Sequence, residues 1–263
     1  MNPMNPINLK LKPISKNSNQ MATPTNFQKV REFNRAFDVM PKSWEITPRP
    51  NIFEEDPNAV MLRLALIREE IGEFQTAFKS FDIIEMRDAI ADILYVIYGM
   101  ADVFGINLDQ LVSEFCGKPA NSNFHMINKH SNLVMCPLDT LITYISQVFS
   151  SLESHCSERN FEQVAKNLRF LLELVYVLAN ILKIDADADF AIVHESNMSK
   201  LCSSESEAIA TVADYEAKYA NGTSPYDSPY YYSIPELNKW CIKNRSSGKV
   251  LKNINYIKVK FDA

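Results

Sequence analysis

The stretch DIIEMRDAIADILYVIYGMADVFG, residues 82–105, decides the fold class. Gly105 favours the end of a helix at this point. The stretch therefore predicts a long amphipathic helix over 84–104, whose apolar side needs a partner. Its apolar residues recur at three- and four-residue steps, the spacing of one helix face; they are Ile90, Ile93, Leu94, Ile97 and Ala101.

The same helical spacing recurs elsewhere in the chain. It predicts long helices over 58–79, roughly 138–156 and 161–182, and a short amphipathic helix around 27–37. Long helices joined by short connections are typical of an all-α helical bundle. The chain has only six glycines and no GxGxxG or Walker-type loop, so a bound nucleotide would need another way to hold its phosphates.

The second pair of long helices resembles a copy of the first. Sliding the chain by 78 positions, without a gap, places Leu94 on Leu172, Tyr98 on Tyr176 and Asp109 on Asp187. Any two amphipathic helices can be slid into a partial match, but here one register holds across two helices and their loop. We interpret the pattern as a tandem duplication of a two-helix unit, with copies at about 58–118 and 137–200.

Composition divides the chain into three parts. Residues 1–24 are rich in Asn, Pro and Ser and contain lysines but no acids, which predicts a disordered tail; a transit peptide is the alternative. Residues 25–203 are expected to form the all-α domain. Residues 204–263 lose the helical period, and from Tyr219 onward they predict a loop-rich C-terminal arm with a short strand or two.

Bulk properties limit the partners and the compartment. A net charge of −5 argues against a general nucleic-acid binder, and no apolar run reaches membrane-spanning length. The five cysteines are scattered without metal-ligand spacing, which is typical of reduced thiols. We expect a cytoplasmic protein, with nuclear and organellar compartments left open.

Two acidic clusters carry the chemistry. Glu69, Glu70 and Glu73 fall within the first long helix, where a three-residue step separates two side chains by about 60° and about 4.5 Å. The next helix carries acids at steps of three and four, which form one stripe. These are Glu85, Asp88 and Asp92.

The clusters have two interpretations. Facing carboxylates raise one another's pKa unless a cation lies between them, and oxygen-only ligands favour Mg²⁺, with Mn²⁺ as a substitute. The alternative is a solvated acidic face, the usual surroundings of Glu on a helix. Two clusters on adjacent helices, with almost no compensating Lys or Arg on the same stripe, leave these alternatives evenly matched.

The order EExxE, ExxD and SNMSK resembles a known family. It is similar to the MazG-like all-α nucleoside triphosphate pyrophosphohydrolases, a superfamily that includes dimeric dUTPases and phosphoribosyl-ATP pyrophosphohydrolase. The resemblance covers roughly residues 26–115 and 190–256, including VHESNMSKL at 193–201 and GKVLKNINY at 248–256. It implies Mg²⁺-dependent cleavage of a nucleoside triphosphate to the monophosphate and pyrophosphate.

The resemblance also implies roles for individual residues. Glu69 would be the base that orients or deprotonates the attacking water, and Asp92 an additional ligand or second-shell partner. Asn197 and Lys200 would contact the phosphates or sugar of the nucleotide. The Mg²⁺ ligands would be Glu70, Glu73, Glu85 and Asp88.

The chain departs from the family pattern in its second copy. Pro119 and Ser122 stand where the first copy would need the equivalents of Asn197 and Lys200. The six acids of the first copy are replaced in the second by residues that form no carboxylate cluster. These are Gln147, Val148, Ser151, Gln163, Lys166 and Phe170.

Because each copy keeps a different half of the site, we predict a pseudo-dimer within one chain, with one composite site; a homodimer is possible. A house-cleaning role on dUTP or dCTP is an expectation from the resemblance alone. Two alternatives stay open. One is a non-catalytic nucleotide-binding or interaction module, and the other is phosphoribosyl-ATP pyrophosphohydrolase.

Overall fold

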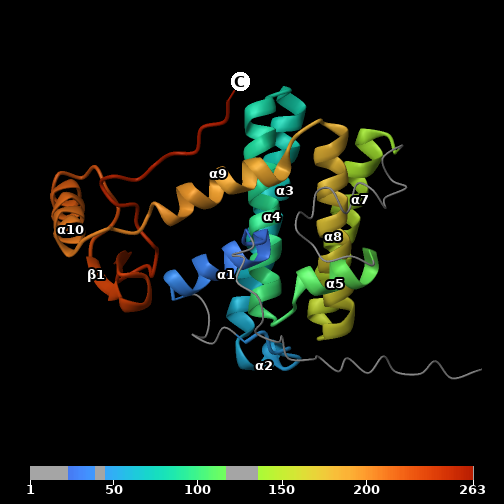
Figure 1. Cartoon of the computed structure of the whole chain (residues 1–263), viewed down its shortest axis with the longest axis horizontal. Coiled ribbons are helices and arrows are strands. Elements are labelled where there is room, and N and C mark those ends of the chain that lie inside the picture. The colour runs from blue at the N-terminus through green and yellow to red at the C-terminus, as the bar shows by residue number, and fades with distance from the viewer. Residues whose placement is uncertain (1–22, 39–44, 117–135, 263) are drawn as a thin grey trace, which may run out of the picture.

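The computed structural model describes residues 23–38, 45–116 and 136–262, and its architecture is all-α (Figure 1). The helices are α1 (Asn26–Ala36), α2 (Ile52–Glu55), α3 (Pro57–Ser80), α4 (Ile83–Val103), α5 (Leu108–Cys116), α7 (Leu138–Ser157), α8 (Phe161–Ile181), α9 (Ala186–Met198) and α10 (Glu205–Ala220). Two strands, β1 (Pro229–Ile234) and β2 (Lys239–Asn244), complete the described fold.

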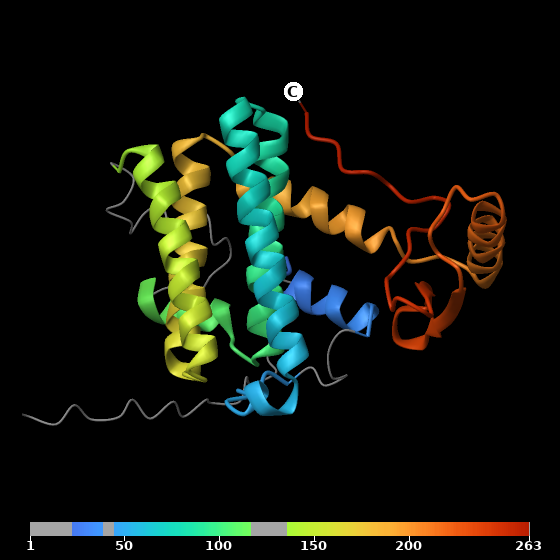
Figure 2. The same cartoon turned by 180° about the vertical axis from the view of Figure 1, so that it is seen from behind.

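The four long helices predicted from the apolar spacing are confirmed to within two residues at each end. Figure 1 shows α3, α4, α7 and α8 running side by side, and Figure 2 shows the same arrangement from behind. Among the described residues no single helix is long and apolar enough to cross a membrane, although the bent pair α4 and α5 passes the same test together. Most of the predicted disordered tail, residues 1–22, lies outside the described residues.

Local sequence explains where the first two long helices begin and end. The side chain of Asp56 accepts a hydrogen bond from the backbone of Ala59 at the start of α3, and Asp82 caps α4 in the same way. Gly105 follows α4 with φ +64, and a Cβ at this position would lie 1.9 Å from the backbone oxygen of Thr47. Glycine is therefore required here both by backbone conformation and by space.

Helix α4 is the centre of the molecule. It packs against α1, α3, α8 and α9, so from Ile93 to Val103 every residue except Val96 is buried. The helix that follows each long pair packs on the other pair. Helix α9 follows α7 and α8 but packs on α4, and α5 follows α3 and α4 but contacts α8. This exchange brings the end of α9 to the helix that carries Asp88 and Asp92.

A buried ion pair connects α1 to α4. Arg31 Nε lies 2.9 Å from Asp102 Oδ1, and Asn34 donates a 2.9 Å hydrogen bond to Asp102 Oδ2. Arg63 on α3 is also buried nearby; burial lowers its pKa and the charge of Asp102 opposes that shift. Gly99 leaves the space for this guanidinium, since a Cβ there would lie 2.8 Å from Arg63 Nη1.

We expect Asp102→Asn to lower the free energy of unfolding by about 3–5 kcal/mol, because it removes the carboxylate that compensates buried guanidinium groups. Urea denaturation followed by circular dichroism measures the change. Asp214→Asn is the matched control, since Asp214 pairs with Lys218 on the surface of α10 and should change stability by less than about 1 kcal/mol. Equal effects of the two substitutions would contradict this account of the buried pair.

The C-terminal arm contains the expected strands and one helix that the sequence analysis did not predict. Strands β1 and β2 form an antiparallel hairpin in which Tyr231 is opposite Ile242. Helix α10 fully buries only Ala208 and Thr211, but Val212 and Tyr215 are partly buried against the same small core as Ala208. These apolar residues lie at steps of four and three, so the sequence did contain an amphipathic signal for this helix. A further signal is the Ser204 cap, whose side chain accepts from the backbone of Glu207, followed by good helix formers.

Candidate active site

The predicted carboxylates face one another across the α3–α4 hairpin. Phe81 and Asp82 form the turn, so residues at similar distances before and after it come opposite each other. Among the charged neighbours of Glu70, Asp92 accordingly has the largest effect on its pKa. The structure thus brings together the acids of both helices, which are Glu69, Glu70 and Glu73 on α3 and Glu85, Asp88 and Asp92 on α4.

Burial and mutual repulsion change the acidity of three of these groups. Burial, followed by the charge of Asp92, raises the pKa of Glu70 to about 8. Burial, followed by the charge of Asp88, raises the pKa of Asp92 to about 7. The pKa of Asp88 is raised by burial and then by Glu85. The other three acids, Glu69, Glu73 and Glu85, are exposed and form the edge of the cluster that faces solvent.

The carboxylate oxygens fit a divalent cation that takes its remaining ligands from water and from a substrate. Among the described residues, no three Asp, Glu, His or Cys side chains are gathered closely enough to hold a metal ion as they stand. Within the described part of the chain, Asp88 Oδ1 is nevertheless buried without a hydrogen-bond partner, as expected of an oxygen that has a ligand to bind. Mg²⁺ usually binds one or two carboxylates and completes its shell with waters and substrate phosphates.

The predicted substrate-binding residues lie across from the carboxylates. Asn197 is in the last turn of α9 and Lys200 follows the helix, with Lys200 Nζ donating a 2.6 Å hydrogen bond to Asn197 Oδ1. The Lys200 ammonium also lies 5.7 Å from the ring centre of Phe33 on α1. Burial lowers the pKa of Lys200, and the charge of Asp92 opposes that shift. The positive group is therefore close enough to the acidic cluster to act on the same ligand.

Comparisons with known proteins identify a matching family and a relative of this chain. The family model described as phosphoribosyl-ATP pyrophosphohydrolase matches residues 30–117, which include the whole α3–α4 hairpin. The uncharacterized protein L479 of Acanthamoeba polyphaga mimivirus is 38% identical over 234 residues, covering 87% of this chain and 91% of that protein. No solved structure matches the chain.

The chain belongs to the MazG-like all-α nucleoside triphosphate pyrophosphohydrolase superfamily. This membership points to a hydrolase that splits a pyrophosphate bond in a nucleotide-like substrate. The matched residues contain all six carboxylates but end before α9, so Asn197 and Lys200 lie outside them.

Three residues beside the superfamily motif were not assigned to the site from sequence. The hydroxyl of Tyr95 lies 3.1 Å from His194 Nδ1 and is also hydrogen-bonded to Asn197. His194 Nε2 lies 3.8 Å from a carboxylate oxygen of Glu32. Burial, followed by the charge of Lys29, lowers the pKa of His194 to about 4, so this ring is neutral at pH 7.

The spacing of α4 contained a signal for Tyr95, which follows Asp92 by three residues and so continues the acidic stripe. Tyr98, by contrast, is fully buried and belongs to the core. No spacing could reveal His194 or Glu32, because they come from α9 and α1 and meet only when both helices pack on α4.

The second hairpin carries no such cluster at the corresponding positions. Val148 is buried, Lys166 pairs with Glu162, and the ring of Phe170 packs edge-on against Tyr144. The positions 119 and 122, where the first copy lacks the equivalents of Asn197 and Lys200, lie outside the described residues. Within the described part of the chain, the acidic site is therefore confined to the first hairpin.

Proposed function

We propose that the protein hydrolyses a nucleoside triphosphate, in the presence of Mg²⁺, to the monophosphate and pyrophosphate. The observation that carries this proposal is the position of Lys200, which binds Asn197 and lies close enough to Asp92 for their charges to interact. Asp92 belongs to the carboxylate cluster that also contains Glu70, Glu73 and Asp88. A negatively charged phosphate chain needs cations, and these side chains would provide them directly or through a metal ion.

The residues divide the reaction between them. Glu70, Glu73, Glu85 and Asp88 would hold Mg²⁺, with Asp92 as an additional ligand or a residue that supports the ligands. Bound Mg²⁺ would neutralise phosphate charge and lower the pKa of a coordinated water. Glu69, beside Glu70 on the exposed edge, would accept the proton of the attacking water. The water oxygen then bonds to the α-phosphorus, the bond from that phosphorus to the bridging oxygen breaks, and pyrophosphate leaves.

Packing of the helices supports a composite site made by both halves of the chain. Lys200 follows the second long pair yet lies beside the carboxylates of the first, because α9 crosses to α4. The aligned residues Tyr98 and Tyr176 are hydrogen-bonded to each other, and both are fully buried. Contact between equivalent residues is expected at the axis of a pseudo-dimer, so we infer that the chain is a fused pair of related units.

A second pair of aligned residues supports the same inference. Thr25 donates a 2.5 Å hydrogen bond to Asp109, and the adjacent Asn26 donates a 2.6 Å hydrogen bond to Asp187. These two aspartates occupy corresponding places at the starts of α5 and α9. They hold neighbouring residues at the start of α1, as two related units would on either side of their axis.

The proposal is tested by incubating the full chain with a panel of substrates and measuring pyrophosphate release. The panel contains canonical nucleoside triphosphates, dUTP, dCTP and phosphoribosyl-ATP, the last because of the family model that matches residues 30–117. We expect turnover of at least one nucleoside triphosphate with Mg²⁺ and none with EDTA. Turnover of phosphoribosyl-ATP alone would favour the second candidate, and binding without turnover would favour a non-catalytic module.

A further inference from the structure

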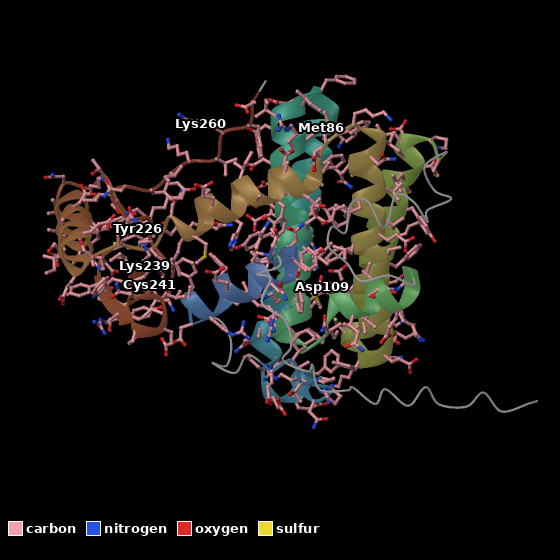
Figure 3. All side chains as sticks on the ribbon, in the orientation of Figure 1. Met86, Asp109, Tyr226, Lys239, Cys241 and Lys260 are labelled. Atoms are coloured by element: carbon pink, nitrogen blue, oxygen red, sulfur yellow. The ribbon has the colours of Figure 1, made fainter. Side chains whose placement is uncertain are left out.

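The segment that leads to the C-terminus is fastened to the end of α9 on both sides of Lys200. The side chain of Asn253 donates 2.7 Å hydrogen bonds to the backbone oxygens of Ser199 and Leu201. The backbone of Ile257 donates a 3.0 Å hydrogen bond to Ser199 Oγ. Beyond these contacts the segment continues past Lys260, labelled in Figure 3, toward the start of α4. Residues 251–257, which we call the strap, therefore border the proposed phosphate site.

Lys252 has a fixed backbone and an exposed side chain. Leu251 before it is buried and donates a 2.9 Å backbone hydrogen bond to Ile242. The hydroxyl of Tyr215 donates a 3.0 Å hydrogen bond to the backbone oxygen of Lys252 itself. These contacts hold the strap at this point, so that the Lys252 side chain projects from a rigid support.

An aromatic contact places the Lys252 ammonium beside Tyr256, a residue that is hydrogen-bonded to α9. Its Nζ lies 4.4 Å from the ring centre of Tyr256, and the hydroxyl of Tyr256 lies 2.9 Å from Ser196 Oγ. Ser196 immediately precedes Asn197, which binds Lys200. Tyr256 thus contacts the ammonium of Lys252 with its ring and, through its hydroxyl, the turn of α9 that carries Asn197.

The charges of the C-terminal arm that act on Lys200 are positive. The charges of Lys252 and Lys249 both lower the pKa of Lys200, whereas Asp92 on α4 raises it. Within the described ranges, none of these three lysines forms an ion pair with a carboxylate. Three neighbouring ammonium groups repel one another, and a bound polyanion would relieve that repulsion.

We propose that Lys252 binds the two terminal phosphates of the substrate and so holds the pyrophosphate that leaves. This inference rests on the proposed function and deepens it. Lys200 lies beside Asp92, where the α-phosphate would meet the metal-binding carboxylates. Lys252 precedes Asn253, which is fastened on both sides of Lys200, so its side chain is placed to meet the next phosphates along the chain.

The test is calorimetric titration of inorganic pyrophosphate with Mg²⁺ into the full chain, compared with titration of a nucleoside monophosphate. Lys252→Met should weaken pyrophosphate binding by about tenfold or more, because it removes a charge-assisted contact. Monophosphate binding should change by less than about twofold, since the terminal phosphates are absent. Lys252→Arg should restore most of the affinity. Lys243→Met is the matched control, since Lys243 lies 5.4 Å over the ring of Tyr232 elsewhere in the arm.

Several results would overturn the assignment. Unchanged pyrophosphate affinity in a folded Lys252→Met protein would exclude the contact, and an equal loss in Lys243→Met would indicate only the net charge of the arm. Equal weakening of monophosphate binding would place Lys252 at the α-phosphate or the sugar. If the wild type binds pyrophosphate through Lys252 but hydrolyses no substrate, the proposed function fails, whereas the assignment of Lys252 as a ligand of the terminal phosphates stands.

Discussion

Glu70→Gln and Asp88→Asn should each lower the rate of pyrophosphate release by roughly 100-fold or more, the scale of losing one electrostatic contact to a transition state. Each substitution removes an anionic oxygen from the cluster while keeping the size of the side chain. Among the described residues Asp88 Oδ1 is buried without a hydrogen-bond partner, as expected of an oxygen that binds a ligand. Steady-state kinetics at saturating Mg²⁺ measures the effect, with Glu162→Gln on α8 as the control.

The same variants should not be destabilised when the metal is absent. Because the folded protein raises the pKa of Glu70 to about 8, it binds a proton that the unfolded chain has released, and stability falls as pH rises from about 4.5 toward 8. Glu70→Gln removes that loss, so its melting temperature in EDTA at pH 7 should equal or exceed that of the wild type. Added Mg²⁺ should stabilise the wild type more than the variant. Equal stabilisation would contradict the assignment of Glu70 as a ligand.

Lys200→Ala should lower the rate of hydrolysis about as severely as a ligand substitution. A lysine on a transferring phosphate provides charge stabilisation of several kcal/mol in a site that excludes water. Lys200 is half-buried and faces Asp92, which is the position this role requires. Lys166→Ala is the matched control, because Lys166 pairs with Glu162 on the exposed face of α8 and should be replaceable without loss.

Two further measurements distinguish a site built from both halves of the chain from a site that the first hairpin forms alone. Stabilisation by Mg²⁺ alone should survive in Lys200→Ala, because Lys200 is not a metal ligand. Titration of a non-hydrolysable nucleotide should saturate at one molecule per chain, whatever the oligomeric state. Two molecules per chain, or full activity in Lys200→Ala, would mean that the first hairpin forms its site without the second.

The long helices and the acidic cluster could be predicted from the sequence for a simple physical reason. Their apolar residues recur at the helical period, and each acid belongs to a stripe whose members are three or four residues apart. Contacts within one helix, or across a tight turn such as the one at Phe81 and Asp82, follow from local spacing alone. The opposition of Glu70 and Asp92 is such a contact.

The remaining parts of the site depend on how separate helices pack. Nothing in the spacing of α9 says that it crosses to α4, so the contact between Tyr95 and His194 could not be foreseen. The position of the strap is harder still to predict from the sequence. The Asn253 side chain donates a hydrogen bond to Ser199, 54 residues away, and no periodic pattern in the sequence indicates this contact. Asn197 and Lys200 were located only through the resemblance of SNMSK to a family motif.

The central claim is attack of water at the α-phosphorus, and hydrolysis in ¹⁸O-labelled water tests it most directly. The products of the preferred nucleoside triphosphate are separated and weighed by mass spectrometry. The account predicts one ¹⁸O atom in the nucleoside monophosphate, unlabelled pyrophosphate, and no diphosphate at any time. Label in inorganic phosphate together with a nucleoside diphosphate would show attack at the γ-phosphorus and contradict it.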